Sequence, residues 1–377
     1  MKIVVAPDKF KGSLSAQEVC NAIEEGIHKF NASIEVIKHP LADGGEGTLD
    51  ILQNYFTLKT VSIIVQNPIF NKIEANYMVS SNTAYIEMCN ASGLKLLKNH
   101  EQNCCFTSTF GTGELIADAL KKGFKNIVLF IGGSATNDAG IGMASALGYE
   151  FYNAKNKLIK PIGINLINID KIKNTNLLFD LSAINFTVVC DVKNVLFGKK
   201  GAAYMYGIQK GASFKYLEVL DNGLKNISEK INSFLNVDIS KIEGGGASGG
   251  LGAGAVAFLN AKLKPGIEFV LEQTNFKSQL QKGIDFIITG EGSTDKQTLE
   301  GKVVKGISDV CNNKKIPFSI ITGVIKDKEI LQEKLNPKII SSIMELGVTV
   351  EDAMQNAYKY VSSLSFEQIK SIKKANV

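Results

Sequence analysis

The sequence predicts an α/β protein with two domains, because short apolar strands alternate with helices along most of the chain. The apolar runs 127–131, 186–190, 286–289 and 318–322 each lead directly into a glycine or an acidic residue. Continuous apolar strands of this kind are typical of parallel sheets that are buried on both faces. The chain has 377 residues, and a domain usually takes about 100–200.

The N-terminal segment predicts a strand, a loop and a helix in that order. The apolar run 3–6 ends at Pro7 and Asp8. Ser15 and Glu18 then form an S-x-x-E capping box, in which each side chain accepts a hydrogen bond from the backbone of the other residue. Apolar residues at helical spacing follow as far as Ile27.

The middle of the chain has a different pattern. Residues 61–88 contain alternating segments separated by turn signals, which predict an antiparallel meander, whereas residues 153–185 show little periodicity. We therefore expect a discontinuous, Rossmann-like domain at residues 1–60 and 282–377, with a doubly wound and mostly parallel sheet. Residues 61–281 would form an inserted α/β domain with a mixed sheet.

The composition excludes several classes of function. The formal net charge is only +5, and no lysine block carries interleaved aromatic residues, so nucleic-acid binding is not expected. The six cysteines lack CxxC spacing, which argues against zinc and indicates reduced thiols in a cytoplasmic protein. No apolar run is long enough to cross a membrane. All 42 basic residues are lysines, so phosphate or carboxylate groups must be bound by lysine, backbone N–H groups or a metal.

Acidic residues follow the ends of several predicted strands. Asp8 follows the first strand, Asp43 lies in LADGGEGT, Asp191 follows VVC, and Glu291 and Asp295 lie in TGEGSTD. Ligands of open α/β sheets bind beyond the carboxyl ends of the strands, and glycine-separated carboxylates suit Mg²⁺. We expect Asp43, Glu291 and Asp295 to bind the metal. For each acid the alternative is a helix cap or a turn.

Two glycine-rich segments are candidate nucleotide-binding loops, because successive free N–H groups before a helix bind anions. One follows a clear strand, and the other runs from Gly244 to Gly254, where close packing of a helix against another backbone is the alternative. The predicted phosphate-binding residues are Gly132, Gly133, Ser134, Thr136, Asn137, Gly245, Gly246, Gly249, Gly250 and Gly252.

The predicted substrate-binding residues are small or cationic. Lys9, Lys11 and Ser13 lie in PDKFKGS, Lys210 lies in QKGAS, and Ser293 lies in GEGS. A lysine ammonium group can act as a point charge on a carboxylate or phosphate oxygen. For any single lysine, a solvated surface position is the alternative.

Together these motifs resemble the bacterial glycerate kinase family of glycolate and sugar-acid catabolism, in the family's order and over most of the chain. The motifs are APDKFKGSLSA (6–16), PLADGGEGT (40–48), TSTFGTGELI (107–116), GGSATNDAGIGM (132–143), CDVKNVLFGKKGAA (190–203), QKGAS (209–213), GGLGAGAVAFL (249–259) and ITGEGSTDKQTLEGK (288–302). The chain departs from the family pattern at Lys9, where serine is usual, and at Ser293, where arginine is usual.

The resemblance implies ATP, Mg²⁺ and D-glycerate as ligands, 2-phosphoglycerate as product, and a site in the cleft between two α/β domains. We expect a monomer or homodimer that uses in-line phosphoryl transfer. Asp191 would accept the hydroxyl proton, with Lys11 and Asp8 also catalytic. The alternatives are a dinucleotide-dependent hydroxy-acid dehydrogenase and a non-catalytic, two-lobed protein that binds sugar acids.

Overall fold

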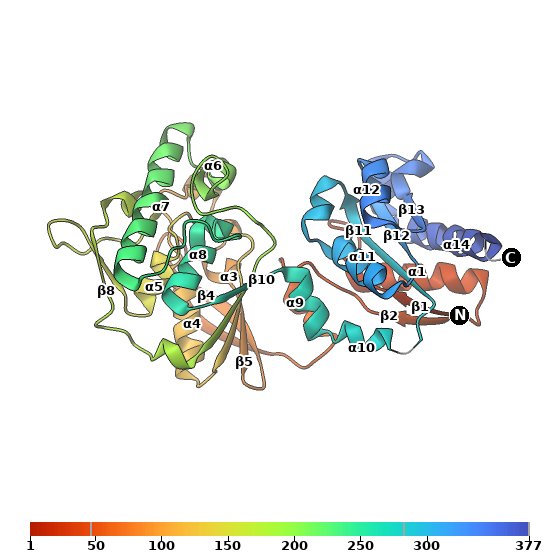
Figure 1. Ribbon diagram of the computed structural model, residues 1–377, viewed down its shortest axis with the longest axis horizontal. Helices are drawn as coiled ribbons and strands as arrows, with labels where there is room; N and C mark the ends of the chain where they lie inside the picture. The colour runs from red at the N-terminus through yellow and green to blue at the C-terminus, as the bar shows by residue number, and fades with distance from the viewer. Residues whose placement is uncertain (46, 282, 376–377) are drawn as a thin grey trace. The chain divides into compact units, whose positions relative to one another are not determined.

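The computed structural model describes residues 1–45, 47–281 and 283–375, and the chain divides into two compact units. Unit 1 comprises Met1–Tyr55 and Pro265–Val377, and unit 2 comprises Phe56–Lys264. Each unit has its own sheet and covering helices (Figure 1). The α/β class predicted from the sequence is therefore confirmed.

Unit 1 is built on a five-stranded parallel sheet in the order β13-β12-β11-β1-β2. Its strands are β1 (Lys2–Val5), β2 (Glu35–Lys38), β11 (Phe286–Thr294), β12 (Phe318–Ile325) and β13 (Ile339–Ser342). The central strands are buried, whereas β2 lies at an edge and is partly exposed. This gradient explains why the central strands are continuous apolar runs in the sequence.

Helices cover both faces of this sheet. They are α1 (Ala16–Phe30), α2 (Thr48–Leu52), α9 (Gly266–Gln273), α10 (Phe276–Leu280), α11 (Val303–Lys314), α12 (Lys328–Leu335), α13 (Val350–Gln355) and α14 (Ala357–Ala375), with the 3₁₀ turns η6 (Lys296–Glu300) and η7 (Ile343–Leu346). The capping box of Ser15 and Glu18 starts α1, as the sequence predicts. Helices α1 and α14 lie side by side (Figure 1), with Phe30 edge-on to Phe366.

The C-terminal segment differs in one respect from the sequence expectation. The sequence predicts a single last helix with Met354, Tyr358 and Val361 on its apolar face. The structure ends α13 at Gln355 and starts α14 at Ala357, so Val361 is buried in the core but Met354 is 47% exposed. Within the described ranges, no helix is both long and apolar enough to cross a membrane.

Unit 2 has a six-stranded mixed sheet in the order β10-β9-β6-β5-β4-β3. Its strands are β3 (Lys59–Gln66), β4 (Lys72–Ser80), β5 (Thr83–Glu87), β6 (Asn126–Phe130), β9 (Asn185–Val189) and β10 (Lys262–Lys264), with a separate hairpin of β7 (Glu150–Tyr152) and β8 (Lys171–Lys173). Strands β3, β4 and β5 pair antiparallel, which confirms the predicted meander. In the same sheet, β5, β6, β9 and β10 pair parallel.

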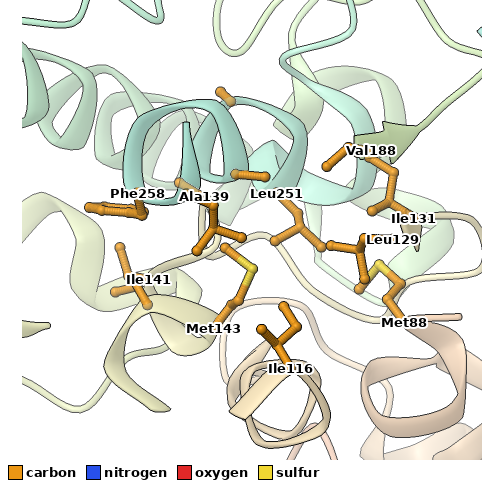
Figure 2. Close-up of a cluster of buried hydrophobic side chains, with 14 of the residues drawn as sticks. Met88, Ile116, Leu129, Ile131, Ala139, Ile141, Met143, Val188, Leu251 and Phe258 are labelled. Atoms are coloured by element: carbon orange, nitrogen blue, oxygen red, sulfur yellow. The ribbon is translucent and has the colours of Figure 1, made fainter. Parts of the chain in front are cut away.

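The helices of unit 2 pack around a large apolar core. They are α3 (Cys89–Ser92), α4 (Phe110–Lys121), α5 (Ile141–Ala146), α6 (Ala202–Tyr206), α7 (Phe214–Leu235) and α8 (Ala247–Leu259), with short 3₁₀ turns between them. Figure 2 shows Leu251 of α8 among side chains from β6, α4 and α5, including Leu129, Ile116 and Met143. This core fixes the loop that joins β6 to α5.

Candidate active site

The strand order of unit 1 creates a topological switch point between β1 and β11. From β1 the chain crosses to β2 on one side, and from β11 it continues to β12 and β13 on the other side. In doubly wound sheets, ligands bind in the crevice outside the carboxyl ends of the strands at this point. Asp8 lies just beyond β1, and Glu291 lies in the adjacent strand β11, where the Asp8 N–H donates to the Gly290 carbonyl at 2.8 Å.

A pocket of about 350 Å³ opens at the switch point, and all of its lining residues belong to unit 1. Its charged side chains are Asp8, Lys9, Lys11, Asp43, Glu291 and Lys302. Ser13 and Ser293 line it as well. The structure thus brings together most of the residues that the sequence predicted for metal and substrate binding in this half of the chain.

Two of the carboxyl groups are buried in an unfavourable environment. Asp8 is 8% exposed, and its pKa is raised to about 8, mainly by burial and to a smaller extent by the charge of Asp43. A hydrogen bond from the Lys9 N–H to Asp8 Oδ1 acts in the opposite direction. Glu291 is 4% exposed, and burial raises its pKa to about 7, against the lowering effects of a hydrogen bond from Thr298 and the charge of Lys302. Carboxyl groups gathered in this way favour a bound cation.

This group fits Mg²⁺ in one particular way. No three His, Cys, Asp or Glu side chains of the described chain converge closely enough to hold a metal ion by themselves. Mg²⁺, however, is commonly bound through one or two carboxylates together with waters and substrate phosphates. Asp8, Asp43 and Glu291 share one pocket and repel one another, which suits a cation that arrives with a polyphosphate.

Asp295 is placed differently from the other predicted metal ligands. Its Oδ1 accepts a hydrogen bond from the Gln297 N–H at 2.8 Å, and Thr298 completes a capping box at the start of η6. It is not among the residues that line the pocket. Asp295 is therefore a helix cap in the structure, as in the alternative left open for every acid, and its role as a metal ligand stays a prediction.

In unit 2, the loop from β6 to α5 is held by a buried lysine. Lys210 is 5% exposed, and its Nζ donates to the Ser134 hydroxyl at 2.7 Å and to the Thr136 carbonyl at 2.9 Å. Burial lowers its pKa to about 8, although Cys104 and Asp138 act in the opposite direction. The predicted substrate lysine and the predicted phosphate loop therefore form one structure.

Asp138, which the sequence analysis missed, holds the same loop from the other side. Its Oδ2 accepts hydrogen bonds from the backbone N–H and the hydroxyl of Thr109 at 2.7 and 2.8 Å. Its Oδ1 accepts one from the Gly140 N–H at 3.2 Å. The side chain is fully buried, and burial raises its pKa. No local pattern indicates this role, because the main partner of Asp138 is Thr109, which is distant in the sequence.

Two donors on this loop lack partners. Thr136 and Asn137 are buried, yet within the described part of the chain neither Thr136 Oγ1 nor Asn137 Nδ2 has a hydrogen-bond partner. A buried polar group without a partner costs roughly 1–3 kcal/mol, so such groups usually meet a ligand or water. Gly132 and Gly133 at the start of the loop are exposed, and Gly133 has a φ of 72°. The loop therefore offers donors to an anion, in a chain without arginine.

The second glycine segment has a packing role in the structure. A Cβ on Gly249 would lie 2.0 Å from the Thr136 carbonyl oxygen, and one on Gly246 would lie 2.3 Å from the Val195 carbonyl oxygen. Gly245, Gly250 and Gly252 also pack against the protein's own atoms. Gly244–Gly254 therefore packs behind the β6–α5 loop, as in the packing alternative, and its role in phosphate binding stays a prediction.

Asp191 lies at the same edge of unit 2 as this loop. Strands β6 and β9 are parallel with Phe130 opposite Val189, so the residues that follow them, Gly132 and Asp191, leave the sheet side by side. Asp191 is half-buried in the segment after β9. It is thus placed with the donor-rich loop of unit 2, whereas Asp8 and Lys11 belong to the pocket of unit 1.

The structure therefore combines a switch-point pocket lined by carboxylates and lysines with a second, donor-rich loop, an arrangement that suits the transfer of a phosphoryl group between small molecules. The profile of the family described as "Glycerate kinase family" matches residues 3–373. The chain belongs to this family and is a kinase.

Individual relatives are similar to this chain over nearly its whole length. The chain is 40% identical over 359 residues to a glycerate kinase of Bacillus cereus, covering 95% of this chain and 94% of the relative. It is 38% identical over 367 residues to a glycerate 2-kinase of Escherichia coli, covering 97% and 96%. A crystal structure of a Salmonella typhimurium LT2 protein assigned as glycerate kinase 2 superposes with a TM-score of 0.85 at 37% identity, covering 100% and 99%.

Proposed function

We propose that the protein transfers the γ-phosphoryl group of ATP to a hydroxyl of D-glycerate and forms 2-phosphoglycerate. The observation that carries this proposal is the pocket at the β1/β11 switch point, where buried carboxyl groups meet lysines. Phosphoryl transfer requires mainly positioning and neutralisation of charge, and little covalent chemistry from the protein. The names of the similar kinases support glycerate as the acceptor.

Asp8, Asp43 and Glu291 are the residues that would hold Mg²⁺. When bound, the ion neutralises the charge that develops on the phosphate oxygens during transfer. Lys9, Lys11 and Lys302 line the same pocket and supply positive charge in place of the arginines that the chain lacks. Ser13 and Ser293 supply hydroxyl groups at its edge.

In unit 2, the β6–α5 loop and Lys210 would bind an anionic group of the substrates. Lys210 has three N–H donors and uses two of them on Ser134 and Thr136. The unpartnered donors of Thr136 and Asn137 would bind the same group. We assign this group as the carboxylate of glycerate, because a short hydroxy acid needs several donors to fix its orientation.

Asp191 is our choice for the group that accepts the hydroxyl proton of the acceptor. It is the acidic residue that leaves the sheet beside Gly132, next to the loop to which we assign glycerate. A general base must lie within hydrogen-bond reach of the proton that it removes.

The two alternative functions receive less support. A dinucleotide-dependent dehydrogenase would need a glycine-rich turn that follows a strand, but Gly244–Gly254 follows a loop and packs against the chain itself. A non-catalytic binding protein conflicts with membership of a kinase family.

The first test is ADP release with Mg-ATP and D-glycerate, followed by phosphorus NMR of the product. We expect ADP release that depends on glycerate and a single 2-phosphoglycerate signal. A 3-phosphoglycerate signal would contradict the proposed position of transfer. Turnover only with another hydroxy acid would contradict the proposed substrate.

A further inference from the structure

The switch-point pocket of unit 1 has an apolar wall that the proposed roles of its charged residues do not explain. The wall is contributed by the C-terminal part of the unit, namely by Ile343, Met344, Val350, Ala353, Met354 and Ala357. These residues come from η7, α13 and the start of α14. The pocket is thus lined by carboxylate and lysine side chains near β1 and β11 and by apolar side chains near α13.

Part of this wall faces solvent. Val350 is 59% exposed and Met354 is 47% exposed. The φ of Gly12 is 83°, and a Cβ there would lie 3.1 Å from the Met354 Cε, so the methionine reaches over the loop that carries Lys9 and Lys11. Exposed apolar side chains that adjoin a polar site are typical of a ligand-binding surface.

Glycerate does not account for this wall. It has three carbons with one carboxylate and two hydroxyl groups, and so presents almost no apolar surface. Its negative charge would also be repelled by Asp8, Asp43 and Glu291. A nucleotide combines a flat, largely apolar base with a polyphosphate that brings a divalent cation, which matches a pocket with one apolar end and one carboxylate-lined end.

From this match we infer that the apolar wall is the binding subsite for the purine base of the nucleotide. The inference rests on the proposed function, because it concerns the phosphoryl donor of that reaction. The base packs against Met344 and Met354, whose flexible and polarisable side chains adapt to an aromatic ring. Val350 lies at the exposed mouth, and the polyphosphate extends toward Asp8 and Glu291.

The absence of tryptophan from the chain permits a direct binding test. Val350→Trp places a single fluorophore at the wall, and an exposed position tolerates the larger ring. Leu346→Trp is the matched control, since Leu346 is 48% exposed in η7 but does not line the pocket. The probes are adenosine, inorganic tripolyphosphate and D-glycerate.

Adenosine should quench the emission of Val350→Trp saturably, because the base stacks against the indole, and should leave Leu346→Trp unchanged. Tripolyphosphate and glycerate should leave the emission of both variants unchanged. Quenching of Val350→Trp by glycerate, or a change that depends on protein concentration and not on adenosine, would overturn the inference. This readout needs no turnover, so its failure is distinct from failure of the proposed function.

A kinetic test complements the binding test. Met354→Ser removes the thioether from the wall without touching a charged residue, and we expect the KM for ATP to rise about fivefold while the KM for glycerate stays the same. An equal rise in both KM values, or a rise for glycerate alone, would contradict the assignment of the base to this wall.

Discussion

The two units place opposite charges at the same position in their folds. Each unit has parallel strands whose carboxyl ends carry polar residues, but unit 1 buries the carboxyl groups of Asp8 and Glu291, whereas unit 2 buries the ammonium group of Lys210. In each case burial shifts the pKa toward the neutral form, to about 8 for Asp8 and about 8 for Lys210. At each edge the opposite charges of the protein do not offset the effect of burial on the pKa, so a ligand of opposite charge would stabilise the ionised form.

From this difference we propose that the two edges bind different substrates. The acidic edge suits a nucleotide that arrives with its cation, and the donor-rich edge suits an anion without one. The two edges are also held in place by different contacts. The loop that carries Asp8 leads into the capped helix α1, whereas the β6–α5 loop, which Lys210 binds, packs against the glycines of α8. Variants that remove one feature of either edge test this comparison.

The largest effect is expected from Asp8→Asn. We expect kcat to fall roughly 10²- to 10³-fold, because the variant removes a charge that would hold the cation on the transferring phosphate. The unliganded variant should unfold at an equal or higher temperature, because asparagine avoids burying a carboxylate beside Asp43 and Glu291. Coupled ADP release and thermal unfolding measure the two effects.

Asp295→Asn is the matched control, because Asp295 lies in the same motif as Glu291 but caps η6. We expect a loss of stability of about 1 kcal/mol or less and nearly normal dependence on Mg²⁺. A large loss of Mg²⁺ affinity in this variant would mean that Asp295 binds the metal after all.

The next largest effect is expected from Asp191→Asn. Loss of a general base typically lowers kcat roughly 100-fold or more, and the KM for ATP should not change because Asp191 lies at the edge of unit 2. Steady-state kinetics with each substrate varied in turn measures this split. Unchanged kcat would remove Asp191 from the proposed mechanism.

A third variant tests the support behind the donor-rich loop. Gly249→Ala should destabilise the protein by about 2 kcal/mol more than Gly283→Ala, as measured by denaturant unfolding. Both glycines have a φ of 69°, so both variants share the backbone strain, but a Cβ at 249 meets the Thr136 carbonyl oxygen at 2.0 Å and one at 283 meets nothing within 4 Å. Equal destabilisation would mean that the glycine segment does not support the loop.

The sequence predicted most of the fold because the central strands are buried on both faces. It missed β2 and β10, since Glu35–Lys38 and Lys262–Lys264 are short, charged and partly exposed strands that carry no continuous apolar signal. It also extended the last helix through Asn356, where the structure separates α13 from α14.

Part of the site was predictable for a related reason. Asp8 follows β1, Asp43 lies in the loop after β2 and Glu291 lies in the C-terminal half of β11, and parallel strands bring such residues to one edge. The sequence could not separate Asp295 from them, because a capping aspartate and a metal ligand look alike locally. The roles of Asp138 and of the wall around Met354 depend on contacts between distant segments, which local patterns do not encode.

The smallest effect is expected from Lys210→Met, and it depends on pH. The KM for glycerate should rise about tenfold at pH 7, because the variant removes one charged donor from the proposed carboxylate site. In the unmodified protein this KM should rise as the pH passes about 8, where the buried ammonium group loses its proton. The variant lacks this group, so its KM should be flat from pH 7 to 9.

The sign for stability is opposite to that for binding. The pKa of Lys210 is lower in the folded protein than its ordinary value of 10.5, so its buried charge opposes folding below pH 8, and this cost disappears as the pH rises from 8 to 10.5. Stability measured over this range should therefore rise more in the unmodified protein than in Lys210→Met. Lys225→Met, at an exposed position of α7, is the control and should reproduce the unmodified protein in both measurements. A pH-dependent KM for ATP in place of glycerate would instead assign the β6–α5 loop and Lys210 to the nucleotide phosphates. It would contradict the proposal that the two edges bind different substrates.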